Sequence, residues 1–161
     1  LSMPTGPGSD PLMPHYLQHL IVEQEFGLKH AIFGQLALGG DADMFHKQKA
    51  GLTKRHLSRQ RSSEKKKSTT SASQGAEASA KSERATYISL HRWMKASSHK
   101  RLKGRAAEIE DSIESALKFM DKDERALYTP VRLEEVVAKM NVLSEPWVST
   151  PVDSHMDIKR E

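Results

Sequence analysis

The sequence contains no cysteine and few aromatic residues, and these absences limit the kind of protein it can be. Without cysteine, a disulfide framework and the usual cysteine-based zinc sites are excluded, and a small secreted scaffold is not expected. Aromatic residues make up 6% and apolar residues 37% of the 161 positions, below the usual share of a globular chain. A packed core is therefore expected in part of the chain only.

Long hydrophobic runs are also missing. No apolar stretch approaches the roughly 20 residues that cross a bilayer. Residues 1–10 are rich in Pro, Gly and Ser and lack the basic and apolar regions of a signal peptide. The chain begins with Leu1 rather than Met, which a removed transit peptide, tag residues before Met3 or an incomplete chain would explain. From the first of these we expect a mitochondrial location, with the cytoplasm as the alternative.

Sequence motifs of common enzymes are absent as well. The chain has no phosphate-binding glycine loop, no dinucleotide-binding glycine pattern and no nucleophile elbow. The pair Gly39-Gly40 is better explained as the end of a helix. We therefore expect a protein that is not an enzyme and that takes no cofactor or small-molecule substrate.

Charge, by contrast, is plentiful and strongly segregated. Residues 1–46 carry one Lys/Arg and five Asp/Glu (net −4), and residues 106–161 carry seven and thirteen (net −6). Residues 47–105, which we call the basic arm, carry seventeen Lys/Arg and three Asp/Glu (net +14). Asymmetry of this kind indicates the partners of a protein more than its fold.

Hydrophobic spacing indicates helices throughout and no strands, so the predicted fold class is mostly α. The expected molecule is an extended helical protein with a basic low-complexity central arm and no independent large core. Its predicted parts are an extended tail (1–13), an amphipathic helix (14–40), a basic helical segment (41–61), a Ser/Lys-rich linker expected to be disordered (62–83), a helical region (84–141, with helices over 84–103, 106–120 and 130–141) and an extended tail (142–161).

The basic arm is the strongest functional signal. Lys and Arg neutralise phosphates and release counterions, which gives affinity for any nucleic acid backbone. The residues expected to contact RNA phosphate are Lys47, Lys49, Lys54, Arg55, Arg59, Arg61, Lys65, Lys66, Lys67, Lys100, Arg101, Lys103 and Arg105. Tyr87, His91 and Trp93 could stack on unpaired bases. A solvated linker is the plainer explanation of any single cluster, and an anionic membrane surface is a weaker rival because the apolar edge of 44–61 is thin.

A second, weaker pattern lies in the first helix. His15 and His19 are four residues apart and Glu23 is four further on, a spacing that can present two imidazoles and a carboxylate to one metal ion. The sequence assigns no ligand beyond these, and a polar helix edge explains such residues more often. No metal site is therefore predicted.

The function we predict is that of a structural component of a large ribonucleoprotein, most specifically a mitochondrial ribosomal protein that contacts ribosomal RNA. One alternative is an accessory subunit of a respiratory or other membrane-attached complex, in which a helix carrying Gly27 and Gly34 packs on a protein partner. Another is a DNA-binding regulator, because 130–150 weakly resembles a helix-turn-helix. Pro146, Pro151 and the lack of Lys/Arg in the putative second helix count against it.

Overall fold

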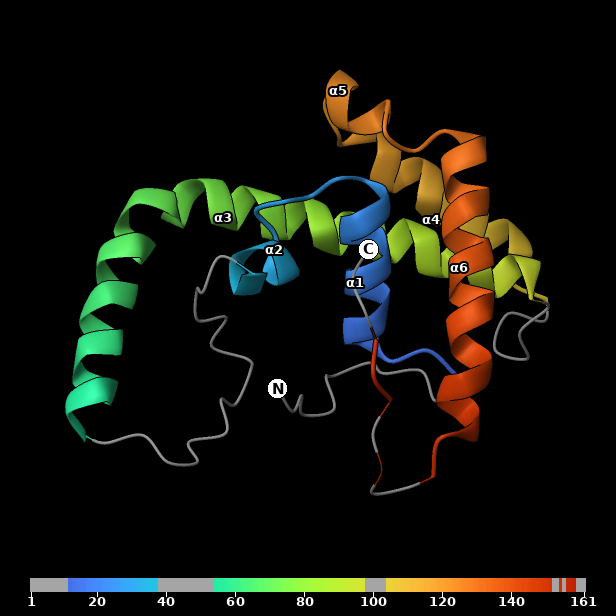
Figure 1. Cartoon of the computed structure of the whole chain (residues 1–161). Coiled ribbons are helices and arrows are strands. Elements are labelled where there is room, and N and C mark those ends of the chain that lie inside the picture. The colour runs from blue at the N-terminus through green and yellow to red at the C-terminus, as the bar shows by residue number, and fades with distance from the viewer. Residues whose placement is uncertain (1–11, 38–53, 98–103, 152–153, 155, 159–161) are drawn as a thin grey trace.

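The computed structural model describes residues 12–37, 54–97, 104–151, 154 and 156–158, and it gives the backbone alone for 54–74. All regular elements within these residues are helices, so the mostly-α prediction is confirmed. They are α1 (His15–Glu25), α2 (Ile32–Ala37), α3 (Lys54–Ala96), α4 (Ala106–Lys118), α5 (Lys122–Arg125) and α6 (Pro130–Ser149). In Figure 1, α1 and α6 lie against one half of α3, and the other half of α3 extends beyond them.

The single helix predicted over 14–40 is wrong, because the chain turns between α1 and α2. Gly27 has a φ of 67°, a left-handed conformation that glycine adopts at little cost and that ends α1. A glycine is needed at position 34 for a different reason: a Cβ added there would lie 1.8 Å from the Lys29 carbonyl oxygen. The two glycines therefore make a tight reversal within the chain, and they do not form a shared face of one helix.

Helix α3 replaces the linker predicted over 62–83. The structure has one helix from Lys54 to Ala96, 43 residues long, which measures about 65 Å along its curved axis at 1.5 Å per residue (Figure 1). Ala, Lys, Arg, Glu and Gln, which are common in this segment, are good helix formers. The prediction considered only burial within the tract and overlooked this propensity. Its second half also packs against α1, α2, α4 and α6, which stabilises the helix further.

The C-terminal helices agree with the helices predicted from the sequence more closely at their starts than at their ends. Helix α4 confirms the helix predicted over 106–120 to within two residues. Helix α6 starts as predicted, with Pro130 in its first turn and the Thr129 hydroxyl accepting from the Arg132 amide. It continues through Pro146 to Ser149, so the extended tail predicted from residue 142 is wrong for 142–149.

The core lies where α1, α3, α4 and α6 meet. Its buried side chains include Leu17, Ile88, Ile113, Val136 and Met140, each with 4% or less of its surface exposed. A polar clamp joins α3 to α5 beside this core: the Arg84 guanidinium donates to both carboxylate oxygens of the buried Glu124, at 2.7 and 2.8 Å. The packed helices therefore form a platform from which the first half of α3 projects (Figure 1).

Candidate functional site

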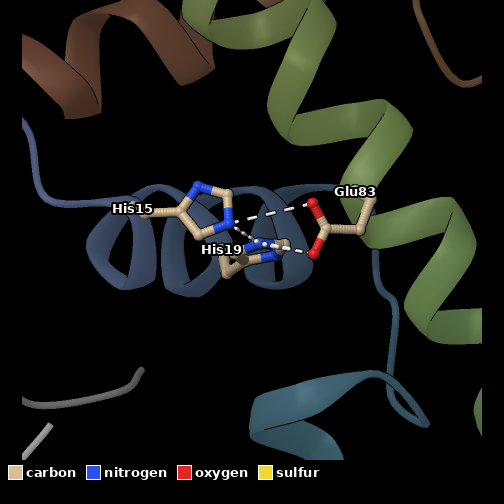
Figure 2. A group of neighbouring side chains, drawn as sticks. All are labelled: His15, His19 and Glu83. Carbon is tan, nitrogen blue, oxygen red and sulfur yellow. Dashed lines mark hydrogen bonds and ion pairs between the residues drawn. The ribbon is translucent and has the colours of Figure 1, made fainter. Parts of the chain in front are cut away.

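Three side chains that can bind metal ions converge between α1 and α3. His15 and His19 are one turn apart on α1, and their Nε2 atoms are 3.0 Å from each other. Glu83 of α3 faces both, with one carboxylate oxygen 3.4 Å from His19 Nε2 and the other 3.8 Å from His15 Nε2 (Figure 2). The two imidazole rings are nearly perpendicular, at 89°. Glu83 is 64 positions from His19, the nearer of the two histidines in the sequence.

The three members differ in their access to solvent. The His19 side chain is fully buried, His15 is 27% exposed and Glu83 is 58% exposed. Burial, and to a smaller extent the charge of His15, lowers the pKa of His19 to about 4. The His19 imidazole is therefore neutral at physiological pH, and the cluster opens to the surface on the side of His15 and Glu83.

A chain of hydrogen bonds behind His19 fixes its orientation. Its Nδ1 is 2.8 Å from the Ser82 hydroxyl oxygen, and the Ser82 hydroxyl donates to Glu23 at 2.9 Å. Because the Ser82 hydrogen is donated to Glu23, the Ser82 oxygen accepts from His19 Nδ1–H, and the Thr86 hydroxyl oxygen lies 3.3 Å from the same nitrogen. This arrangement leaves the lone pair of His19 Nε2 directed into the cluster.

Glu23 has a structural role in place of the metal-ligand role considered for it. Its two carboxylate oxygens accept from the amides of Ile32 and Phe33, at 3.1 and 2.8 Å, which caps the start of α2. Burial raises the pKa of Glu23, and the hydrogen bonds from these amides and from Ser82 oppose the rise. The spacing of His15 and His19 places these two side chains together as considered, while the carboxylate of the cluster comes from Glu83 of α3.

An open groove of about 540 Å³ runs alongside the cluster. His15 and Glu83 form part of its wall, and Gln18, Tyr87 and Leu90 continue it. Gln18 is fully buried, and its amide oxygen has no hydrogen-bond partner among the described residues, although its amide nitrogen donates to the Met13 carbonyl. The cluster is thus accessible to a small solute through the groove, on the side of His15 and Glu83.

The residues predicted to contact RNA phosphate fall into three groups. Lys47, Lys49, Lys100, Arg101 and Lys103 lie outside the described residues. Arg105 lies before α4 and pairs with Glu108 across a 2.6 Å hydrogen bond. The remaining seven occupy positions of α3 for which the structure gives the backbone: Lys54, Arg55, Arg59, Arg61, Lys65, Lys66 and Lys67.

The predicted base-stacking residues do not form one surface. Trp93 is only 2% exposed and its indole N–H donates to the Asn141 side chain at 2.8 Å, so its predicted stacking role is wrong. Its helical spacing with Leu90 and Met94 is typical of a residue that packs against other helices, and Trp93 belongs to the core. Tyr87 is 42% exposed, and its ring lies 4.2 Å from that of His91, centroid to centroid. These two rings form a small exposed pair beside the groove.

Sequence reasoning missed Glu83 as a partner of the two histidines. No local pattern marks it, because it lies in the tract predicted to be a linker. A continuous α3 would have placed Ser82, Glu83 and Thr86 within one turn and made them candidates to face α1. Glu83 was therefore missed because this tract was not predicted to be helical.

Comparison with known proteins adds no assignment: no family model, curated protein or solved structure matches the chain. Among the described helices, none has the length and apolar character needed to span a membrane.

Proposed function

We propose that the protein is an RNA-binding structural component of a large ribonucleoprotein. The observation that carries the proposal is the basic end of α3, defined as residues 54–67, where seven of fourteen positions are Lys or Arg and only Glu64 is acidic. A helix this rich in positive charge attracts a phosphate backbone without reading its sequence. Its projection away from the other helices supports the same proposal (Figure 1).

The helical register gathers these positions. Positions 54, 61 and 65 fall along one line of an α-helix, and positions 55, 59 and 66 along a second line about 120° around the axis from it. From 54 to 66 the helix rises about 18 Å, so these two basic lines extend over several nucleotides. A flexible linker of the same composition would spread its charges over many conformations. The helix therefore strengthens the electrostatic argument that composition alone supplied.

The charge and the exposed apolar side chains of the platform are suited to contacts with protein neighbours. Residues 106–161 have a net charge of −6, which repels phosphate and favours an orientation with the basic end of α3 toward RNA. Phe119, at the end of α4, is 92% exposed, and Val142 of α6 is 69% exposed. A component held between RNA and protein fits this division of charge.

The two alternative functions receive less support. A helix-turn-helix over 130–150 needs a turn, and α6 is continuous from Pro130 to Ser149, so that structural prediction is wrong. An accessory subunit held by protein contacts would stay in its complex after nuclease treatment, whereas an RNA-held component would be released. We expect release.

RNA binding is tested by neutralising the basic end of α3. We expect Arg55→Gln, Arg59→Gln, Lys65→Gln and Lys66→Gln together to weaken binding to a 20-nucleotide RNA at least tenfold at low salt. The slope of log K against log salt should fall by up to about 0.7 per lost phosphate contact for single strands. Fluorescence anisotropy titrations at several salt concentrations measure both quantities.

A charge-matched control removes four basic residues of the platform: Lys118→Gln, Lys122→Gln, Arg125→Gln and Arg132→Gln. We expect this variant to keep both the affinity and the salt slope. Equal losses in the two variants would mean that net charge, and not the basic end of α3, determines binding, and the proposal would be rejected.

The assembly we propose first is the mitochondrial ribosome. Native protein should co-sediment with ribosomal subunits from mitochondria and shift to the top of the gradient after ribonuclease treatment. A protein that sediments free of RNA at low salt would contradict this assignment.

A further inference from the structure

The cluster of His15, His19 and Glu83 has more acceptors than hydrogens. With its Nδ1–H donated to Ser82, His19 offers only a lone pair at Nε2. Both Glu83 oxygens are acceptors as well, and they lie 3.4 and 3.8 Å from the two Nε2 atoms. The single hydrogen that His15 Nε2 can carry serves only one of these acceptors.

We propose that His15, His19 and Glu83 bind one divalent transition-metal ion, with Zn²⁺ as the best-suited occupant. A cation at the centre of the cluster would contact both imidazole nitrogens and the carboxylate at once. The site lies in the platform and is independent of the proposed RNA contact.

The spacing of the ligand atoms matches such an ion. In a tetrahedral zinc site with bonds of 2.0–2.1 Å, neighbouring ligand atoms are about 3.3 Å apart. The measured separations are 3.0 Å between the imidazole nitrogens and 3.4 and 3.8 Å from them to the carboxylate oxygens. Helical spacing of four residues places the two histidines on one face of α1, and α3 delivers the carboxylate from the opposite side (Figure 2).

Residues behind the cluster are arranged as they are behind known zinc ligands. A ligating histidine normally donates its other ring N–H to a carboxylate, carbonyl or hydroxyl, which orients the ring. His19 donates to Ser82, and Ser82 donates to Glu23, whose position the α2 amides fix. His19 is therefore held in place before any ion arrives.

Three protein ligands leave a fourth position for solvent or a small ligand. Because His15 and Glu83 line the groove, this position faces it. Two imidazoles favour Zn²⁺ and related ions over Mg²⁺ and Ca²⁺, which prefer oxygen ligands. The site is thus specific in chemistry and open to solution.

Titration calorimetry of the full chain, freed of metal by a chelator, tests this site without RNA. We expect one Zn²⁺ per chain, no binding of Mg²⁺, and a Co²⁺ complex whose visible absorption is typical of four-coordination. His15→Ala and Glu83→Gln should each weaken Zn²⁺ binding at least tenfold. Ser82→Ala, which removes the support behind His19, should weaken it by about tenfold.

The matched control is His30→Ala, which removes an exposed histidine that lies outside the cluster. It should bind Zn²⁺ as the parent does, and circular dichroism without metal should show the same helix content in all variants. Absence of tight binding in the parent would overturn the proposal. So would binding that survives both His15→Ala and Glu83→Gln, or that falls equally in His30→Ala.

Discussion

At the scale of single residues, the buried polar groups carry the most specific information. Glu23, His19 and Ser82 are each almost fully buried, and each has a defined hydrogen-bond partner. Hydropathy patterns treat such residues as the polar side of a helix. Their burial depends on the packing of α1 on α3, which links residues about sixty positions apart, so the sequence could not predict it.

Replacing Glu23 tests this network. Glu23→Ala removes the acceptor for the Ile32 and Phe33 amides and for Ser82, which leaves donors without partners at the start of α2. We expect the free energy of unfolding to fall by about 2–3 kcal/mol. Urea denaturation measures it, with the exposed Glu134→Ala on α6 as a control that should change by less than about 0.5 kcal/mol. Equal effects of the two changes would contradict the assigned role.

The lowered pKa of Glu110 leads us to expect that the stability of the fold depends on pH. The Lys95 hydrogen bond and the nearby Arg92 charge lower the pKa of Glu110 below its usual value. A lowered pKa in the folded state stabilises the protein above the unfolded value of about 4.5, and this contribution is lost as the pH falls through the folded pKa. Since Glu110 is partly exposed, Glu110→Gln should cost under about 1 kcal/mol at pH 7. Denaturation at pH 7 and pH 3 should show the difference disappearing in acid.

At the scale of elements, helix starts were easier to predict than helix ends. Thr129-Pro130 fixed the start of α6, and amphipathic spacing fixed α4. The end of α6 was predicted too early, at residue 141, because the chain beyond it was assigned to an extended tail. Near the actual end of the helix, the Thr150 hydroxyl donates to the Pro146 carbonyl and the Ser149 hydroxyl donates to the Glu145 carbonyl. Helix α5 was not predicted at all, since four residues give no periodicity.

The ion pair between Arg84 of α3 and Glu124 of α5 should contribute measurably to the stability of the fold. Arg84→Ala would leave the buried Glu124 carboxylate without its bidentate partner and should lower the free energy of unfolding by about 3 kcal/mol. Arg84→Lys should recover only part of this loss, because one ammonium cannot reproduce the paired geometry. Thermal unfolding of both variants measures the order, and a full recovery by lysine would contradict it.

At the scale of the whole molecule, the structure separates a platform from a projecting helix, and this separation can be tested directly. The described core draws its side chains from 12–36 and 85–156, on either side of segment 38–74. The two ends of that segment are also near each other: a Cβ on Gly75 would lie 2.9 Å from the Gln35 side chain. A short Gly/Ser linker can therefore join residue 37 to residue 75.

We expect this internal deletion to leave the platform folded and to abolish RNA binding. Shortening the connection from 37 residues to about eight lowers the entropy cost of closure, worth about 1 kcal/mol of added stability at most. Cooperative thermal unfolding near the parent midpoint, retained one-to-one Zn²⁺ binding and loss of the salt-dependent RNA affinity are the expected results. If the deleted chain unfolded without cooperativity, the first half of α3 would belong to the fold; if it kept RNA affinity, the platform itself would be the binding surface.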